Sequence, residues 1–367
     1  MLTSRLIKKN SIYRGDSMTN RDLIIRLRQD QILDREEFRQ ILKGLCPEDE
    51  EFLYENAREV REVSYGKDVY TRGLIEFSNY CVKNCLYCGI RAGNPDCERY
   101  RLTEDQIQEC AETGYDLGFR TFVLQGGEDP FFDDDKFCRI IKRIKDSFPD
   151  CAVTMSVGEK SRKSYEAFFD AGADRYLLRH ETISPDHYRI IHPHGQSIES
   201  RKKCLYELKD IGYQVGVGIM IGSPGQTEDH IINDLLFMKE FQPQMVGMGP
   251  FIPHEQTPFR DKRAGKLQDV LHILAIVRLM LPEVLLPATT ALGTLFPTGR
   301  ELGIKAGANV VMPNLSPKGV RAKYALYDGK ICTGEEAAEC IGCLTNRINS
   351  TGYHINAARG DCAGFFN

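Results

Sequence analysis

The stretch EFSNYCVKNCLYCGI, residues 76–90, carries three closely spaced cysteines, Cys81, Cys85 and Cys88. Their spacing, C-x3-C-x2-C, places three thiol ligands on one loop. Most iron-sulfur cubanes are held by four cysteines, so a cluster bound by this set leaves one iron without a protein ligand. In catalytic metal sites such an open position is where a reactant binds. The stretch therefore predicts an iron-sulfur cluster that takes part in chemistry.

A zinc site or a disulfide framework fits the three cysteines less well. Structural zinc sites pair C-x2-C with a second such pair or with histidines, and the first histidine downstream is His180. A disulfide framework is disfavoured because the chain has 13 cysteines, an odd number, and is too long to need such cross-links. This cysteine usage indicates a reducing cytoplasm.

The triad resembles that of the radical S-adenosylmethionine (SAM) superfamily, in which an aromatic residue, here Tyr87, stands before the last cysteine. The resemblance implies that Cys81, Cys85 and Cys88 hold a 4Fe-4S cluster whose open iron binds SAM, with Tyr87 close to the cofactor. It also implies that an electron from the cluster cleaves SAM and produces a 5'-deoxyadenosyl radical.

The composition is that of a globular enzyme: 367 residues, 42% hydrophobic and 27% charged, with a net charge of −4. The longest apolar stretch, 270–281, is interrupted by His272 and Arg278, which favours a buried helix over a membrane span. The charge pattern indicates no surface for nucleic acid. Two interpretations of the first 17 residues are expected: a disordered leader, or a chain whose translation truly starts at Met18 in place of Met1.

Eight short apolar runs alternate with segments of helical length. The runs are 73–78, 121–125, 152–157, 175–179, 215–221, 245–249, 284–289 and 309–313. Such alternation is typical of a parallel sheet, and eight units in about 250 residues predict an α/β fold, a complete (β/α)8 TIM barrel. The competing interpretation is a six-unit partial barrel with an additional α/β piece.

Three parts of the chain are expected: a leader with helices over 1–62, the barrel over 63–325, and a C-terminal extension with further cysteines over 326–367. The active site of such a barrel lies where the strands end and the following loops begin. The cysteine loop follows the first run directly, as this rule requires.

The second run ends at Gln125, Gly126 and Gly127, where two glycines let the backbone approach a ligand closely. The turn resembles the element that radical SAM enzymes place beside the methionyl amino group of SAM, although a Gly-Gly turn between a strand and a helix is common. Ser156, near the end of the third run, is expected either to bind SAM or to hydrogen-bond the nearby backbone.

The fourth run ends in three titratable residues, Arg179, His180 and Glu181. The Glu181 carboxylate is expected to accept hydrogen bonds from the ammonium group or the ribose hydroxyls of SAM. Arg179 is expected to be the fixed cation of the substrate chamber. Arg201, in the following helix, reads on its own as a solvated helix residue; the resemblance implies that its guanidinium holds the SAM carboxylate.

The later runs add polar groups at the expected barrel mouth. The glycine-proline turn over 220–227 either leaves backbone groups free for an adenine edge or simply ends the strand. Thr289 and Thr290 either bind a small anionic or polar substrate or hydrogen-bond the backbone. Together with Gln125 they predict an anion-binding chamber, to which Met312 contributes packing or a ligand contact.

Further motifs narrow the resemblance. Most of the chain, from about 25 to 345, resembles the HydE family of iron-only (FeFe) hydrogenase maturases, a group that also includes biotin synthase and methylornithine synthase. The stretches that carry it are EFSN (76–79), CLYCG (85–89), VLQGGEDP (123–130), YLLRHET (176–182), MVGMGPFIPH (245–254) and PATTA (287–291). The resemblance implies radical attack at the sulfur of a cysteine-bound iron complex with carbonyl and cyanide ligands, a step in assembly of the dinuclear iron subcluster of the hydrogenase H-cluster.

A second cysteine set, Cys332, Cys340 and Cys343, follows the last run with the spacing C-x7-C-x2-C. Three nearby thiols in a cytosolic chain indicate metal binding. The resemblance implies an accessory iron-sulfur cluster, either 2Fe-2S or 4Fe-4S. The remaining cysteines lack paired spacing and are expected to be packing or surface residues: Cys46, Cys97, Cys110, Cys138, Cys151, Cys204 and Cys362.

Two further functions stay open. A mutase or synthase of the methylornithine or biotin synthase type uses the same radical to take a hydrogen atom from carbon. A non-catalytic iron-sulfur carrier or scaffold passes clusters to a partner, and has no use for Glu181 and Arg201 around a barrel mouth. The expected partners are a small or organometallic substrate, a reductant such as ferredoxin or flavodoxin, and other hydrogenase maturases. Neither nucleic acid nor a membrane is expected.

Overall fold

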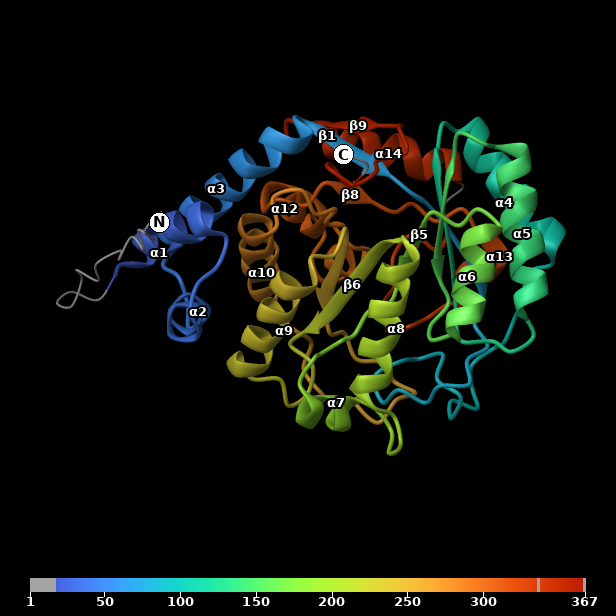
Figure 1. The fold of residues 1–367 in the computed structure, drawn as a ribbon, viewed down its shortest axis with the longest axis horizontal. Coiled ribbons are helices and arrows are strands. Elements are labelled where there is room, and N and C mark those ends of the chain that lie inside the picture. Colours follow the sequence, from blue (N-terminus) through green and yellow to red (C-terminus); the bar gives the residue numbers. More distant parts are fainter. Residues whose placement is uncertain (1–17, 335–336, 366–367) are drawn as a thin grey trace, which may run out of the picture.

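Six parallel strands form the central sheet (Figure 1). The computed structural model describes residues 18–334 and 337–365. The strand order, β2-β3-β4-β5-β6-β7, follows the chain, so each strand pairs with the next. The strands are β2 (Gly73–Ser78), β3 (Thr121–Gly126), β4 (Ala152–Ser156), β5 (Arg175–Leu177), β6 (Gln214–Ile221) and β7 (Met245–Pro250). The first six expected strands are thereby confirmed.

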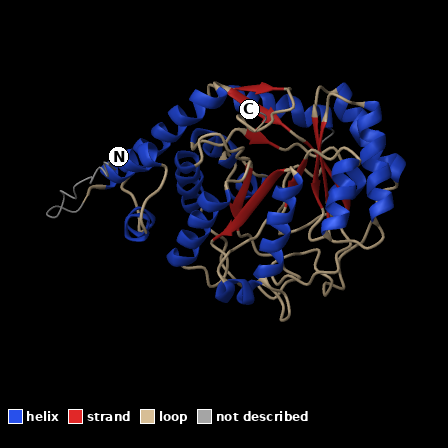
Figure 2. Ribbon diagram, in the orientation of Figure 1, coloured by secondary structure: helices blue, strands red, loops and turns tan. Residues whose placement is uncertain are grey.

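Burial along whole strands explains why these runs form a parallel sheet. Every residue of β2 and of β6 is buried. Strands covered on both faces show nearly continuous apolar sequence in place of alternation, and β6 reads QVGVGIMI. Helices lie around the outside of the strands (Figure 2).

Helices follow the strands in the expected alternation. They are α4 (Glu104–Asp116), α5 (Asp134–Ser147), α6 (Arg162–Asp170), α7 (Pro185–Ile191), α8 (Ile198–Ile211), α9 (Glu228–Phe241), α10 (Leu267–Met280), α11 (Thr290–Leu295), α12 (Gly299–Lys305), α13 (Lys318–Arg321) and α14 (Ala337–Asn349). Helix α5 shows how the sequence specifies them. Asp133 caps it by accepting from the Lys136 N–H, and the buried Phe137, Ile141 and Ile144 share one helical face.

Three helices precede the sheet: α1 (Asn20–Asp30), α2 (Arg35–Leu42) and α3 (Pro47–Tyr65). Helix α3 packs along α10, which is buried from Val270 to Met280. The prediction of a buried helix is therefore confirmed. No helix in the described ranges is long and apolar enough to cross a membrane. The expected leader, 1–17, lies outside the described residues.

The last two expected strands are not part of this sheet. The run 284–289 makes isolated bridges in place of a continuous ladder. The eighth run contains β8 (Val310–Val311), which belongs to a second sheet with β1 (Asp68–Thr71) and β9 (His354–Asn356). Pro287 has no N–H to donate to a ladder, and β8 is only two residues long. The eight-stranded sheet of the prediction is thus present as six strands and bridged flanking segments.

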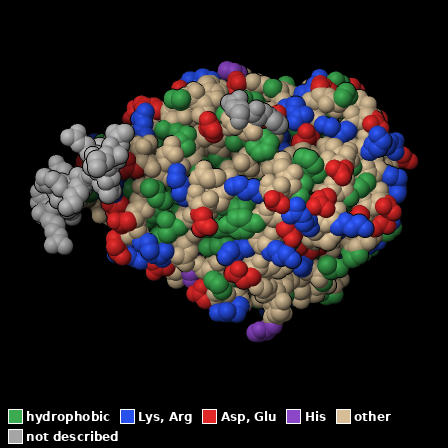
Figure 3. Space-filling view, in the orientation of Figure 1, with side chains coloured by type: hydrophobic (Ala, Val, Ile, Leu, Met, Phe, Trp, Pro, Cys, Tyr) green, Lys and Arg blue, Asp and Glu red, His purple; other side chains and the backbone are tan. Residues whose placement is uncertain are grey.

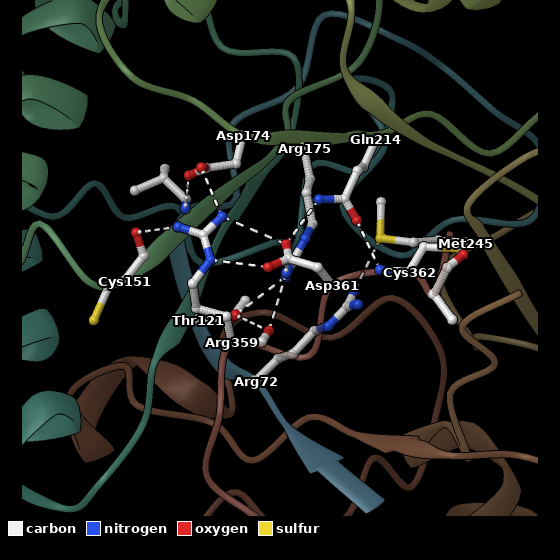
Figure 4. A network of polar contacts seen from close by, with 12 residues as sticks. Arg72, Thr121, Cys151, Asp174, Arg175, Gln214, Met245, Arg359, Asp361 and Cys362 are labelled. Carbon is white, nitrogen blue, oxygen red and sulfur yellow. Dashed lines mark hydrogen bonds and ion pairs between the residues drawn. The ribbon is translucent and has the colours of Figure 1, made fainter. Parts of the chain in front are cut away.

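The C-terminal segment covers the amino ends of the strands with a buried polar network (Figure 4). Asp361 accepts hydrogen bonds from Arg175 Nη2 (2.6 Å) and Gln214 Nε2 (2.7 Å), at the first residues of β5 and β6. Arg359 pairs with Asp361 at 3.0 Å and with Asp174 at 2.9 Å. Because Arg175 is fully buried, Asp361 supplies the charge that neutralises it.

Arg72, between β1 and β2, is a second buried guanidinium at this end of the sheet. Its Nη1 lies 2.9 Å from the Met245 sulfur, while its Nε and Nη2 have no hydrogen-bond partner among the residues that the structure describes. Burial and repulsion from Arg175 hold the pKa of Arg72 well below its ordinary value, and Asp361 opposes this shift. The Asp361 carboxylate therefore pairs with the buried Arg175 and also favours the charged form of the buried Arg72.

Replacement of Asp361 by alanine is expected to lower the free energy of unfolding by about 3 kcal/mol at pH 7, because it leaves Arg175 buried without its counter-charge. Burial opposes ionisation of Asp361, but Arg359, Arg175 and Gln214 together hold its pKa below the ordinary value of 3.8. A depressed folded pKa adds stability above the unfolded pKa and loses it as the pH falls through the folded one. Urea unfolding should therefore be measured between neutral and acidic pH. The difference in free energy of unfolding between the variant and the wild type should become smaller only below about pH 4.

The control is Asp146→Ala, which removes an exposed partner of Lys142 and is expected to cost no more than about 0.5 kcal/mol. An Asp361→Ala protein no less stable than this control would contradict the assignment.

Candidate active site

Three neighbouring segments hold the cysteine loop, residues 81–88, against the carboxyl ends of the strands. The N–H groups of Val82, Leu86 and Gly89 each donate to a carbonyl oxygen, at 3.0, 3.0 and 2.9 Å. The acceptors lie in the turn after β3, in α7 and in the segment after α13. The loop is thus fixed by backbone bonds from three directions.

The turn at Gly126 and Gly127 lies unusually close to this loop. A Cβ at Gly127 would overlap the Tyr80 carbonyl oxygen and lie 2.8 Å from the Cβ of Cys81, and one at Gly126 would meet the Phe77 ring. Neither glycine has positive φ, so close approach and not backbone conformation excludes other residue types here. The close approach expected from the sequence is made to the cysteine loop itself.

The three thiols are partly buried and lie near one another. Burial raises the pKa of Cys81, and it raises the pKa of Cys85 to about 12. The pKa of Cys88 rises through burial and through repulsion from Cys85 and Cys81. A metal centre removes this penalty because it binds cysteine as thiolate. The donor set therefore fits an iron-sulfur cluster better than free reactive thiols.

Across 18–334 and 337–365, no three His, Cys, Asp or Glu side chains stand close enough to hold a single metal ion. A four-iron cluster takes each thiolate on a different iron atom, which is a wider arrangement than a one-ion site.

Glu181 occupies a left-handed backbone conformation, with φ of 63°. Such a conformation costs a non-glycine residue about 1–3 kcal/mol. Its N–H donates to the Gly218 carbonyl at 2.9 Å, and its carboxylate accepts from Arg179 Nη2 at 2.9 Å. These bonds hold the carboxylate next to Arg179.

A buried pair beneath Glu181 fixes this turn. His180 and Asp234 are both fully buried, with His180 Nε2 lying 3.4 Å from Asp234 Oδ1. The same oxygen accepts the Ile183 N–H at 2.5 Å, and the Gly218 N–H approaches His180 Nδ1 at 3.4 Å. The Nε2 atom of His180 has no hydrogen-bond partner among the described residues, and Asp234 Oδ1 is the carboxylate oxygen beside it. Asp234, in α9, thus contacts the chain on both sides of Glu181, through the His180 ring and through the Ile183 N–H.

Arg201 lies in a cluster of charges beside the cysteine loop, with only 12% of its side chain exposed. Its Nε donates to Glu159 at 2.7 Å, and its Nη2 lies 4.0 Å from Glu128. Lys83, between the first two cysteines, lies 3.6 and 3.3 Å from the same two carboxylates, Glu128 and Glu159 respectively. The Nη1 of Arg201 also donates to the Arg179 carbonyl at 3.0 Å. Arg201 is therefore not a solvated helix residue.

Lys83, Glu128 and Glu159 are site residues that sequence reasoning did not single out. Glu128 directly follows the Gly-Gly turn, and Lys83 lies inside the triad. Their positions within these motifs could have identified both as site residues. Glu159 lies beyond the end of β4 in no motif. Burial raises the pKa of Glu128, and Lys83 and Arg201 oppose that rise. Gly158 makes room for Glu128, because its φ is 76° and a Cβ there would overlap the carboxylate.

Ser156 and Tyr87 lie at the same edge of the sheet. Ser156 ends β4 and pairs in register with Gln125 of β3. Tyr87 is half-buried and packs edge-on against His192, with ring centroids 5.6 Å apart. Burial raises the pKa of Tyr87 well above its ordinary value, with further contributions from the nearby Cys85 and Glu181.

A cavity of about 160 Å³ opens at the carboxyl ends of the strands. Every residue expected to form the substrate chamber lines it: Gln125, Arg179, Thr289, Thr290 and Met312. Arg179 Nη2 is shared between Glu181 and the Ile219 carbonyl, both at 2.9 Å. Thr289 also caps α11, since its hydroxyl accepts the Leu292 N–H at 3.4 Å. Thr289 therefore makes the expected hydrogen bond to the backbone and also lines the cavity.

Glu76, Asn314 and Lys330 form a buried polar group in the cavity wall that the sequence did not predict. Glu76 accepts hydrogen bonds from Lys330 Nζ (2.6 Å) and Asn314 Nδ2 (2.7 Å). Burial raises the pKa of Glu76, while Lys330 and Asn314 favour its charged form. The available signal was an acidic residue within the apolar β2 run.

The second cysteine set extends from the cavity wall to the surface. Cys332 lines the cavity with φ of 62°, and Arg300 Nη2 lies 3.3 Å from its sulfur. Cys343 is exposed on α14, and both thiols contribute to the pKa of Arg347. The side chain of Cys340 lies outside the described residues.

Comparison with known proteins identifies the family. Residues 75–238 match the family model of the radical SAM superfamily. The chain is 45% identical over 340 residues to the [FeFe] hydrogenase maturase subunit HydE of Thermotoga maritima, covering 91% of this chain and 95% of that protein. This chain belongs to the HydE family of radical SAM enzymes.

The HydE-family chain is also similar to other radical SAM proteins. It is 31% identical to the 3-methylornithine synthase of Methanosarcina barkeri, over 82% of this chain and 84% of that one. The crystal structure of methylornithine synthase (PylB) aligns with a TM-score of 0.81 at 29% identity, covering 91% of this chain and 97% of that chain. The structure of the maturase HydG aligns with a TM-score of 0.77 at 19% identity, over 92% and 76% of the two chains, and shows a shared fold.

Gly127→Ala is expected to reduce the iron taken up on anaerobic reconstitution to roughly half or less, because the added Cβ displaces the Tyr80 carbonyl and Cys81. Iron and sulfide analysis and visible absorption measure the loss. The matched control is Gly319→Ala, since a Cβ at Gly319 meets nothing within 4 Å. Equal iron contents in the two variants would show that the close approach does not shape the cysteine loop.

Asp234→Ala is expected to lower the free energy of unfolding by about 2 kcal/mol, because it removes the acceptor of the Ile183 N–H and the partner of His180. Release of the turn should also move the Glu181 carboxylate, which the sequence predicts to contact SAM, and so weaken SAM binding by about tenfold. Urea unfolding and anaerobic calorimetry measure the two effects. Asp234→Asn keeps an acceptor for Ile183 and should lose less; a destabilised Asp234→Ala protein with unchanged SAM affinity would rule out the positioning role.

Proposed function

We propose that this HydE-family enzyme cleaves SAM reductively at a 4Fe-4S cluster held by Cys81, Cys85 and Cys88. In cells it acts as a maturase in assembly of the dinuclear iron subcluster of the FeFe-hydrogenase H-cluster. The observation that carries the proposal is the set of three partly buried thiols on one fixed loop. The relationship to a HydE protein over nearly the whole chain supports the maturase role. When bound, the cluster supplies the electron that breaks a sulfonium–carbon bond of SAM.

The charge cluster beside the loop is the proposed SAM site. Arg201 holds the SAM carboxylate, for which a planar guanidinium is suited. Glu181 accepts from the ammonium or ribose groups, and it lies close enough to Tyr87 to raise the pKa of that phenol. Ser156 and the Gly126-Gly127 turn complete the site at the ends of β4 and β3. Opposite charges placed close together suit a zwitterionic ligand such as the methionyl end of SAM.

The cavity lined by Arg179 is the proposed substrate chamber. It combines this cation with hydroxyl and amide groups from Thr289, Thr290 and Gln125, and with the apolar side chain of Met312. Such a lining suits a small anionic or organometallic substrate, in line with maturation chemistry. Enclosure by the strands keeps water from quenching a radical.

We propose that the eight units close into a complete (β/α)8 ring. Isolated parallel bridges support this by linking β7 to Leu285, Pro287 to Val310, and Asn314 back to Leu74 of β2. Backbone hydrogen bonds accompany the bridges, among them Leu74 N–H to the Pro313 carbonyl at 2.9 Å.

The second set, Cys332, Cys340 and Cys343, is proposed to hold an accessory iron-sulfur cluster. The nearness of Cys332 and Cys343 to one guanidinium, that of Arg347, supports it. The proposed partners are a reductant of the ferredoxin or flavodoxin class and other hydrogenase maturases. The proposed location is the cytoplasm, in keeping with the cysteine usage.

A second candidate is a mutase or synthase of the methylornithine type. The similarity to 3-methylornithine synthase in sequence and to PylB in structure favours it over an iron-sulfur carrier. The maturase and synthase reactions differ in their products, because attack at sulfur leaves the adenosyl group bonded to sulfur while abstraction from carbon leaves free 5'-deoxyadenosine.

Cys85→Ser is expected to reduce dithionite-driven release of methionine from SAM by about 100-fold or more, because the cluster loses one of its three ligands. Chromatography of anaerobic reactions measures methionine independently of the fate of the radical. Cys343→Ser should retain the wild-type rate, since its cluster is accessory.

Methionine release by the Cys85→Ser protein at the wild-type rate would contradict the proposed function. Product analysis then separates the two candidates. With a cysteine-bound iron carbonyl-cyanide complex as substrate, a sulfur-linked adenosyl product supports the maturase. With an amino-acid substrate, free 5'-deoxyadenosine and an altered carbon skeleton support the synthase.

A further inference from the structure

Two segments that follow the carboxyl ends of strands carry five exposed cations, a set named here the basic rim: Arg189 at the end of α7, and Arg260, Lys262, Arg263 and Lys266 in the loop between β7 and α10. Residues 260–266 carry four cations against one anion, in a chain whose net charge is −4. The rim is therefore a local excess of positive charge on an acidic protein.

The basic rim is almost without ion pairs. Arg260 lies 3.5 Å from Asp261, and the other four cations have no carboxylate within 4.0 Å among the residues that the structure describes. On the face of the molecule drawn in Figure 3, basic and acidic side chains are interspersed. Clustered cations repel one another, and an anionic partner relieves this repulsion.

The two parts of the rim are held against one turn, residues 222–225. A Cβ at Gly225 would lie 2.9 Å from the Ile190 side chain, and one at Gly222 would overlap the backbone of Gly265. Ile190 follows Arg189, and Gly265 precedes Lys266. The end of α7 and the basic loop therefore pack against the same turn.

The same surface adjoins the cysteine loop. Leu86, between the second and third cysteines, packs with Ile191 and Phe259 in one apolar cluster. Its N–H also donates to the Ile191 carbonyl at 3.0 Å. Ile191 lies two positions after Arg189, and Phe259 lies directly before Arg260. The cations of the rim are thus attached to the segments that touch the cluster ligands.

An apolar side chain completes the surface. Ile190 is 44% exposed, and it lies beside Arg189 at the edge of the rim. Small interfaces with an apolar contact and a charged border are typical of transient electron-transfer complexes. The rim residues do not line the substrate cavity, so a partner bound here leaves that cavity accessible.

We infer that the basic rim and Ile190 form the docking surface for a small acidic one-electron carrier protein of the ferredoxin or flavodoxin class. The inference rests on the proposed function, because each SAM cleaved requires one electron. The carrier is oxidised by one electron, and the cluster site is reduced by one. That electron is consumed as the sulfonium–carbon bond breaks, which yields methionine and the adenosyl radical. Opposite charge steers the carrier to the rim and makes the encounter depend on salt.

The test is the charge reversal Arg263→Glu with Lys266→Glu, measured with an acidic 2[4Fe-4S] ferredoxin. Binding of the oxidised ferredoxin to the full-length protein should weaken by about tenfold or more at low salt, because attraction at two sites becomes repulsion. The KM for reduced ferredoxin in methionine release should rise in parallel. Dithionite-driven methionine release should stay within about twofold of wild type, since a small reductant needs no docking surface.

The matched control reverses two exposed cations outside the rim, Lys43→Glu with Lys305→Glu, and changes the net charge equally. This control should bind ferredoxin as the wild type does. Equal ferredoxin affinities for the rim variant and the control, or a rim variant that loses the dithionite-driven rate as well, would overturn the inference. Wild-type protein that releases no methionine with dithionite would overturn the proposed function, and the binding measurement would still decide the role of the rim.

Discussion

Close contact between two backbones, at Gly127 and at Tyr80-Cys81, determines the layout of the site. It brings the turn after β3 against the cysteine loop, where the Glu128 carbonyl accepts the Val82 N–H at 3.0 Å. The side chain of Glu128 then faces Lys83 and Arg201. A single small residue thereby sets the position of the first thiol and of the charges beside it, so the two halves of the site cannot shift independently.

The two ends of the sheet use buried charge differently. At the mouth, Arg201 and Lys83 face two carboxylates, so cations and anions are matched and a zwitterion can exchange partners with them. At the opposite end Asp361 is ion-paired with Arg175 and also opposes the lowering of the Arg72 pKa. The paired charges at the mouth can exchange partners with a ligand, whereas Asp361 at the opposite end links the C-terminal segment to the strands.

Local patterns in the sequence predicted what depends on neighbours in the chain. The spacing of Cys81, Cys85 and Cys88, the apolar runs of six strands and the position of Glu181 at a strand end were all readable. Partners distant in sequence were not: Lys330 lies 254 residues from Glu76, and Asp361 lies 186 residues from Arg175. The last two apolar runs, 284–289 and 309–313, were expected to be strands of the central sheet. Periodicity alone could not show that they form isolated bridges and a short strand of the second sheet.

The network around Asp361 also has a consequence for the order of folding. Arg175, at the first residue of β5, leaves the ribosome long before residue 361, and proteins begin to fold during synthesis. Until the late segment arrives, the strands enclose a guanidinium without its counter-charge. Burial of Arg175 together with its counter-charge therefore requires a nearly complete chain.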